Sequence, residues 1–144
     1  LVDDPERQRI NLRLVDRIDQ VFVLSRFFVR TAFLGEGIRV SQAEADVIAG
    51  LSDMLSATHR RLTGRRPRPE DASATDRALD AVTALDASLE ARLADPRFDE
   101  GLRLTLIHQV MLHDLFAGLR DLDRLLDERK RLLETRSLVR LGDG

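Results

Sequence analysis

The sequence predicts an all-α fold, an antiparallel up-down four-helix bundle with long first and last helices. Two observations predict it. Apolar residues recur three or four positions apart through four segments, and stretches containing proline or glycine separate these segments. No segment alternates apolar and polar residues as a half-buried strand does. The 144 residues suit one domain with a continuous core, so we expect a single domain over residues 1–144.

The first helix is expected to start near Asp4, because aspartate is a favourable N-cap and Pro5 suits the first helical position. It is expected to end at Gly35-Glu36-Gly37, since glycine tolerates the left-handed conformation that closes many helices. Its main apolar stripe is predicted to be Leu14, Ile18, Phe22, Val29 and Phe33.

The second helix is expected to open with a capping box at Ser41-Gln42-Ala43-Glu44 and to end at Gly64. Two prolines at alternate positions make Arg65 to Asp71 the clearest loop. The predicted stripe of this helix is Ile48, Leu51, Leu55 and Leu62.

The third helix is expected to start near Ser73 or Thr75 and to end at Asp95-Pro96, because a residue before proline avoids helical geometry. Its many alanines predict a close approach to a neighbouring helix. Its predicted stripe is Leu79, Val82, Leu85, Leu89 and Leu93.

The fourth helix gives the strongest pattern and is expected to run from near Asp99 to about Arg136. It exceeds the middle helices in length, so the stretch from Arg120 to Leu141 should project beyond them or fold back. In an up-down bundle both chain ends lie at one end. The apolar residues that define the pattern are Leu104, Ile107, Met111, Leu115, Leu119, Leu122, Leu126 and Leu133.

Composition excludes several classes of function. The chain is 43% hydrophobic and 33% charged with a net charge of −2, which indicates a globular protein without the basic excess that nucleic acids attract. Without cysteine, there is no disulfide, thiolate ligand or thiol nucleophile. No nucleophile elbow, P-loop or dinucleotide-binding motif occurs, so we expect neither an enzyme nor a cofactor.

The ends and the apolar runs of the chain bear on its setting. The chain starts at Leu1 and shows no signal peptide, so we expect a piece of a larger protein. The longest dense apolar stretch, Val21 to Leu34, is shorter than the roughly 18–20 residues that span a bilayer and contains two arginines. The expected location is cytoplasmic, with the cytosolic face of the inner membrane as its specific form.

Histidines and aspartates give a weak case for a metal site, and we expect none. His108 and His113 are five positions apart and do not share a helix face; His108 is expected in the core or at its boundary. The fragment from Arg120 to Asp127 resembles the Asp/Glu-x-x-x-Asp motif of PhoU-like metal-binding proteins, with Asp123 and Asp127 as its acidic pair. No second copy of the motif occurs in the first half of the chain, so a charged, solvated helix face is the preferred interpretation of the fragment.

Two groups of arginines can be explained either as structural residues or as parts of a binding surface. Arg26 and Arg30 interrupt the apolar half of the first helix; either this helix is central and they pair with Asp80 or Asp86, or its apolar surface is exposed for docking. The candidate interaction surface consists of Val23, Phe27, Leu34, Leu125 and Leu132. The second group consists of Arg60, Arg61, Arg65, Arg66 and Arg68. We expect these arginines to lie in solvent on a loop, and the alternative is that they bind phosphates or lipid headgroups.

The segment from His113 to Leu133, HDLFAGLRDLDRLLDERKRLL, resembles the helical cytosolic portions of fusaric acid resistance-type bacterial inner-membrane efflux proteins. The resemblance covers the last third of the chain and rests on its arginine, leucine, alanine and aspartate texture. It implies a cytosolic accessory domain of a membrane protein, without catalysis, attached to membrane segments outside this chain.

The leading functional hypothesis is a non-catalytic helical interaction and oligomerisation domain, whose partner is another protein or a second copy. The membrane-transporter accessory domain is its specific form. Two alternatives stay open, a PhoU-like regulatory metal or phosphate-signalling module and a ligand-sensing bundle. A cavity lined by Phe22, Phe28, Phe33 and Phe116 would favour the sensor, whose ligand is unknown.

Overall fold

The computed structural model describes residues 4–33, 40–95, 97 and 100–142, and within these ranges the chain is all-helical. Four α-helices occur in the order α1 (Pro5–Phe33), α2 (Gln42–Leu62), α3 (Ala74–Ala94) and α4 (Glu100–Gly142). A short 3-10 helix, η1 (Pro69–Ser73), precedes α3. The predicted all-α class is therefore confirmed.

Local sequence signals set the described helix ends. At the start of α2, Ser41 accepts a hydrogen bond from the Glu44 amide, and the Glu44 carboxylate accepts one from the Ser41 amide, which confirms the capping box. After α2, Gly64 takes a positive φ of 67°, the conformation that glycine adopts without strain. The predicted stop at residues 35–37 and the predicted start at Asp99 lie outside the described residues.

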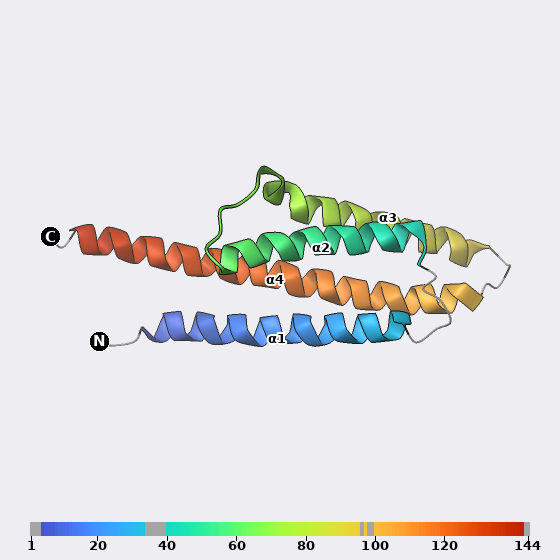
Figure 1. The fold of residues 1–144 in the computed structure, drawn as a ribbon, viewed down its shortest axis with the longest axis horizontal. Coiled ribbons are helices and arrows are strands. Elements are labelled where there is room, and N and C mark those ends of the chain that lie inside the picture. The colour runs from blue at the N-terminus through green and yellow to red at the C-terminus, as the bar shows by residue number, and fades with distance from the viewer. Residues whose placement is uncertain (1–3, 34–39, 96, 98–99, 143–144) are drawn as a thin grey trace.

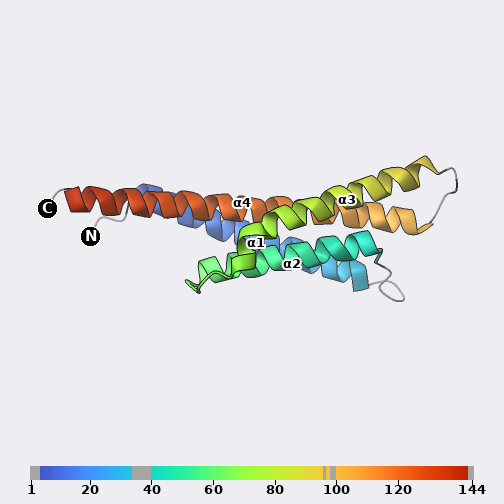
Figure 2. The same ribbon diagram turned by 90° about the horizontal axis from the view of Figure 1, so that it is seen from above.

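Helices α2, α3 and α4 pack together, whereas α1 lies along α4 alone (Figure 1). In the described part of the chain, α1 makes no helix contact with α2 or α3. In the view from above, α1 passes behind α4, farther from the viewer than α2 and α3 (Figure 2). These contacts do not confirm the up-down bundle predicted from the sequence, because the first helix packs outside the group formed by the other three.

The α4 helix is unbroken and is the common neighbour of all the others. Its middle section buries Met111, Leu115, Leu119, Leu122 and Leu126, as the sequence predicts. The predicted stripe residues nearer its ends, Leu104, Ile107 and Leu133, are exposed. The last turns project beyond α2 and α3, and α1 begins at the same end of the molecule at which α4 ends (Figure 1).

The predicted stripe of α1 is wrong. Only Leu14 of its described members is buried, whereas Ile18, Phe22 and Val29 are exposed. Steps of four residues drift around a helix by about 40° each, because a turn takes about 3.6 residues. The buried line instead repeats every seven residues, at Leu14, Val21 and Phe28.

The stripes of α2 and α3 are right in part. Leu51, Val82, Leu85 and Leu89 are buried, while Leu55, Leu62, Leu79 and Leu93 are exposed.

Among the described residues, no helix combines the length and apolar content that crossing a bilayer requires.

Candidate interaction surface

The outward faces of α1 carry an unusual amount of exposed apolar surface. Val23 and Phe27, both predicted for the interaction surface, are each 61% exposed, and Phe22 is 58% exposed. A shallow hollow of about 680 Å³ follows this part of the helix between these side chains and the guanidinium groups of Arg26 and Arg30. Such a face on a helix is typical of a surface that a partner covers.

Other predicted surface residues lie elsewhere. Leu125 is 4% exposed and belongs to the core, beside the α1–α4 groove. The buried line of α1, which repeats every seven residues, covers that side of α4. Leu132 is half-buried on α4, and Leu34 lies outside the described residues. Of the predicted surface, the structure therefore exposes Val23 and Phe27 together on one helix.

The predicted pairing of Arg26 and Arg30 with Asp80 or Asp86 is wrong for the described residues, because α1 does not contact α3. The Arg26 guanidinium lies over the ring of Phe22, 5.7 Å from its centroid, on the same helix. Asp86 instead accepts hydrogen bonds from two residues of α4, His113 and Gln109, at 2.7 and 2.6 Å.

A cavity lined by four phenylalanines, together with a paired arginine, would favour the ligand-sensing alternative. Phe28 and Phe116 are buried in the core, but Phe22 is exposed on α1. The Phe33 side chain lies outside the described residues. Phe22 therefore does not line a cavity with the two buried rings.

The acidic group on α4 is divided between different cations. Arg61 of α2 contacts Asp123 at 3.4 Å and Asp127 at 2.6 Å, whereas Asp121 faces Arg17 of α1 at 3.4 Å. Nowhere in the described ranges do three His, Asp or Glu side chains converge to hold a metal ion. Arg61 occupies the place that a shared cation would take in the PhoU-like interpretation.

A cleft of about 870 Å³, lined by both apolar and charged side chains, lies where the α2–α3 connection meets α4. Burial raises the pKa of Asp123, while hydrogen bonding from Thr58 and the charge of Arg61 act in the opposite direction. Five arginines and three aspartates line the cleft, so positive charge is in excess there. The charged residues that line it are Arg61, Arg66, Arg68, Asp71, Arg120, Asp123, Arg124 and Asp127.

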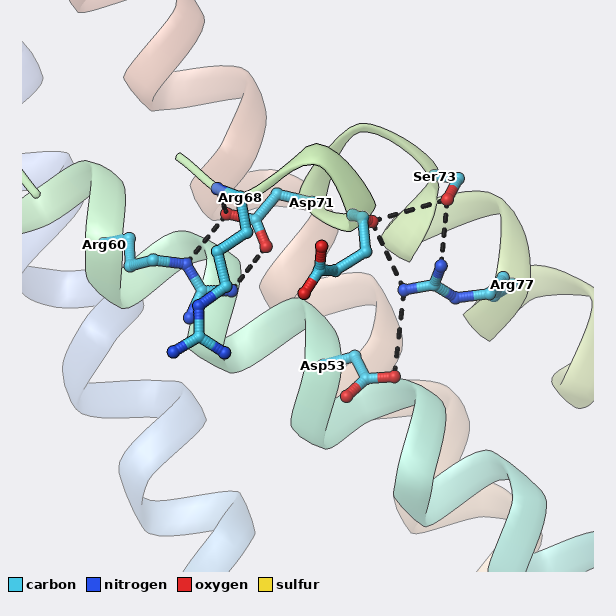
Figure 3. A network of polar contacts seen from close by, with 7 residues as sticks. Asp53, Arg60, Arg68, Asp71, Ser73 and Arg77 are labelled. Atoms are coloured by element: carbon cyan, nitrogen blue, oxygen red, sulfur yellow. Dashed lines mark hydrogen bonds and ion pairs between the residues drawn. The ribbon is translucent and has the colours of Figure 1, made fainter. Parts of the chain in front are cut away.

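The α2–α3 connection is tied down by two ionic contacts (Figure 3). Arg60 binds both carboxylate oxygens of Asp71, which also accepts a hydrogen bond from the Arg68 amide at 3.0 Å. Arg77 donates to Ser73 at 2.9 Å and faces Asp53 at 3.8 Å. Part of the predicted basic cluster therefore anchors the loop instead of remaining free in solvent.

A buried polar pair joins α2 to α4, which sequence reasoning found only in part. His108 is 2% exposed, as predicted for a core histidine, and its Nδ1 lies 3.4 Å from Glu44 Oε2. The ring of Phe28 on α1 contacts the His108 ring edge-on at 5.5 Å between centroids. Glu44 was recognised as a helix cap, but no pattern along the chain could show that it also faces a histidine 64 residues away.

No protein-family model, curated protein or solved structure matches this chain. The geometry of α1 therefore carries the functional argument.

Proposed function

We propose that the chain is a non-catalytic helical interaction and oligomerisation domain that binds its partner through the outer face of α1. The observation that carries the proposal is the isolation of α1, which packs on α4 alone and leaves Phe22, Val23 and Phe27 more than half exposed. Large apolar side chains clustered on one helix are costly to leave in water. Burying them against another protein removes that cost.

The specific form that we propose is the cytosolic accessory domain of a bacterial membrane transporter, at the cytosolic face of the inner membrane. In this proposal the four helices connect in the antiparallel up-down sense. Two features support it: the texture of residues 113–133, and the position of the start of α1 and the end of α4 at one end of the molecule (Figure 1). Chain ends at one end of the molecule suit a domain that hangs from, or is inserted into, a larger body.

The reading frame on either side of this chain tests the transporter part. Flanking apolar runs of about 20 residues support it, and a frame without them overturns it.

Cysteine labelling tests the interaction part, because the chain has no cysteine of its own. V23C places one thiol on the outer face of α1, and E90C places a matched thiol on the exposed side of α3. Maleimide is expected to label V23C about tenfold more slowly in the full-length protein in its own cells than in the dilute purified chain. E90C is expected to react equally in both. Equal labelling of V23C in both settings would overturn the proposal.

A further inference from the structure

Two lines of residues at coiled-coil spacing run along opposite faces of α1. One packs on α4. The second, which we call the outer seam, has the same alternation of three and four residues but is shifted by two positions, about 200° around the helix. The outer seam therefore faces directly away from α4, and all its residues are exposed. The line on α4 is Ile10, Leu14, Arg17, Val21, Leu24 and Phe28, and the outer seam is Leu12, Val15, Asp19, Phe22, Arg26 and Val29.

Charges along the outer seam are separated by sign. Asp19 within the seam and Asp16 on its flank precede Phe22, and Arg26 within the seam and Arg30 on the same flank follow it. None of these four charged residues forms an ion pair with another residue in the part of the chain that the structure describes, since the α1–α4 ion pairs use other residues of α1. The seam thus has an acidic half, an apolar centre and a basic half.

We propose that the outer seam binds the outer seam of a second copy of this chain, with the two α1 helices antiparallel and the two-fold axis beside Phe22 and Val23. This inference rests on the proposed function and names its partner. In this register, Asp19 lies opposite Arg26 of the other copy and Asp16 opposite Arg30. Each pair occurs twice, because the contact is two-fold symmetric.

Charge complementarity selects the antiparallel arrangement. A parallel pair of seams would place Asp19 against Asp19 and Arg26 against Arg26, and like charges in facing positions are destabilising. Charged residues within an otherwise apolar seam fix register and orientation in coiled coils at some cost in stability. Phe22 within the seam and Val23 on its flank supply the apolar centre, and Leu12, Val15 and Val29 extend it toward both ends.

Charge reversal tests the pairing in the purified full chain by sedimentation equilibrium. The wild type is expected to reach twice the 16.3 kDa of one chain as its concentration rises. D19R and R26D should each raise the dissociation constant by about tenfold or more, since each opposes like charges twice. The D19R/R26D double variant should return within about threefold of wild type, because the pairs are restored with exchanged signs.

D80R on the exposed side of α3 is the matched control and should leave the dissociation constant unchanged. Circular dichroism checks that every variant keeps its helices. A wild type that stays monomeric at all concentrations would overturn the inference, and so would a double variant that is no better than the single ones.

Disulfide formation tests the direction of the two helices. V23C lies beside the proposed axis and is expected to form an intermolecular disulfide on mild oxidation. L12C should not, because an antiparallel copy places its counterpart about 30 Å away along the helix. A disulfide in L12C as efficient as that in V23C would indicate parallel helices and reject the proposed register.

The two proposals can fail separately. A monomeric purified chain whose V23C thiol is nevertheless protected in the full-length protein retains the interaction surface and rejects the second copy as its partner. A monomeric chain with V23C unprotected in both settings rejects both proposals.

Discussion

Buried polar atoms show how single residues constrain this chain. Glu44 and His108 are almost fully enclosed, and the Glu44 Oε1 and His108 Nε2 atoms have no hydrogen-bond partner among the residues that the structure describes. A buried carboxylate or imidazole with an open position destabilises the folded state unless its remaining contacts compensate. The stability of the α2–α4 contact therefore depends on the two residues as a pair.

The H108L substitution is expected to lower the free energy of unfolding by about 1–3 kcal/mol, measured by urea denaturation. It leaves the Glu44 carboxylate buried, with only the Ser41 amide as a partner. Combining E44Q with H108L is expected to recover about 1 kcal/mol, because a neutral amide is less costly to bury than a carboxylate. A double variant less stable than H108L would show that the buried carboxylate is not the source of the loss.

The Asp71 carboxylate is expected to titrate far below an ordinary aspartate. Its hydrogen bonds from Arg60 and from the Arg68 amide lower its pKa from 3.8 to about 2. Because the folded-state pKa is depressed, the stabilisation is present above pH 3.8 and is lost as the pH falls through about 2. Carboxyl chemical shifts in NMR should show this midpoint, and R60Q should move it back toward 3.8. A wild-type midpoint near 3.8 would contradict the bidentate contact.

Helix α3 approaches α2 closely because both present small residues at the crossing. A Cβ atom added at Gly50 would lie 3.0 Å from Ala78 Cα and 3.3 Å from Ala78 Cβ. Ala78 is itself fully buried, which agrees with the close approach that the alanines of this helix predict. The spacing of these two helices is therefore set by the absence of one methyl group.

The G50A substitution is expected to destabilise the fold by about 1–3 kcal/mol, although alanine favours helices over glycine by about 1 kcal/mol. The added methyl must push two backbones apart. G142A is the matched control, because a Cβ there meets nothing within 4 Å; its effect should stay within about 0.5 kcal/mol. Thermal denaturation of both variants checks this, and a stabilised G50A would show that the helices can separate freely.

At the scale of the whole molecule, α4 contacts each of the other three α-helices, and its final section is exposed. Residues 133–142 are all exposed, and one contact along this stretch is the ion pair between Arg136 and Asp4 at the start of α1. The Asp4 side chain is largely buried, whereas that of Arg136 is exposed. The end of α4 is thus available for contacts outside this chain.

Truncation after Ser137 is expected to change the free energy of unfolding by less than about 0.5 kcal/mol, since the removed side chains bury little surface. It keeps the Arg136–Asp4 pair. L112A, at a fully buried position of the same helix, should cost about 2–5 kcal/mol and calibrates the measurement. A truncated chain as unstable as L112A would mean that the last turns pack against something, such as a second copy.

The sequence by itself determined the helical segments and several of the helix ends. Helical spacing located four helices, and the Ser41–Glu44 capping box and Gly64 marked ends that the structure reproduces. These signals are local, because a cap or a turn depends on residues a few positions apart. The same local reasoning placed Val23 and Phe27 among candidate exposed apolar residues, and both are exposed.

Only the tertiary structure decided which faces are buried. Leu125 and Phe22 look alike in sequence, as apolar residues within an amphipathic pattern, yet the first lies in the core and the second faces outward. Burial depends on which helix lies alongside, and residues far apart in the chain determine this. The Glu44–His108 pair and the division of Asp121 from Asp123 by different arginines have the same origin. Periodicity shows that a helix has an apolar face, whereas the packing of α1 on α4 alone determines which of its two seams is covered.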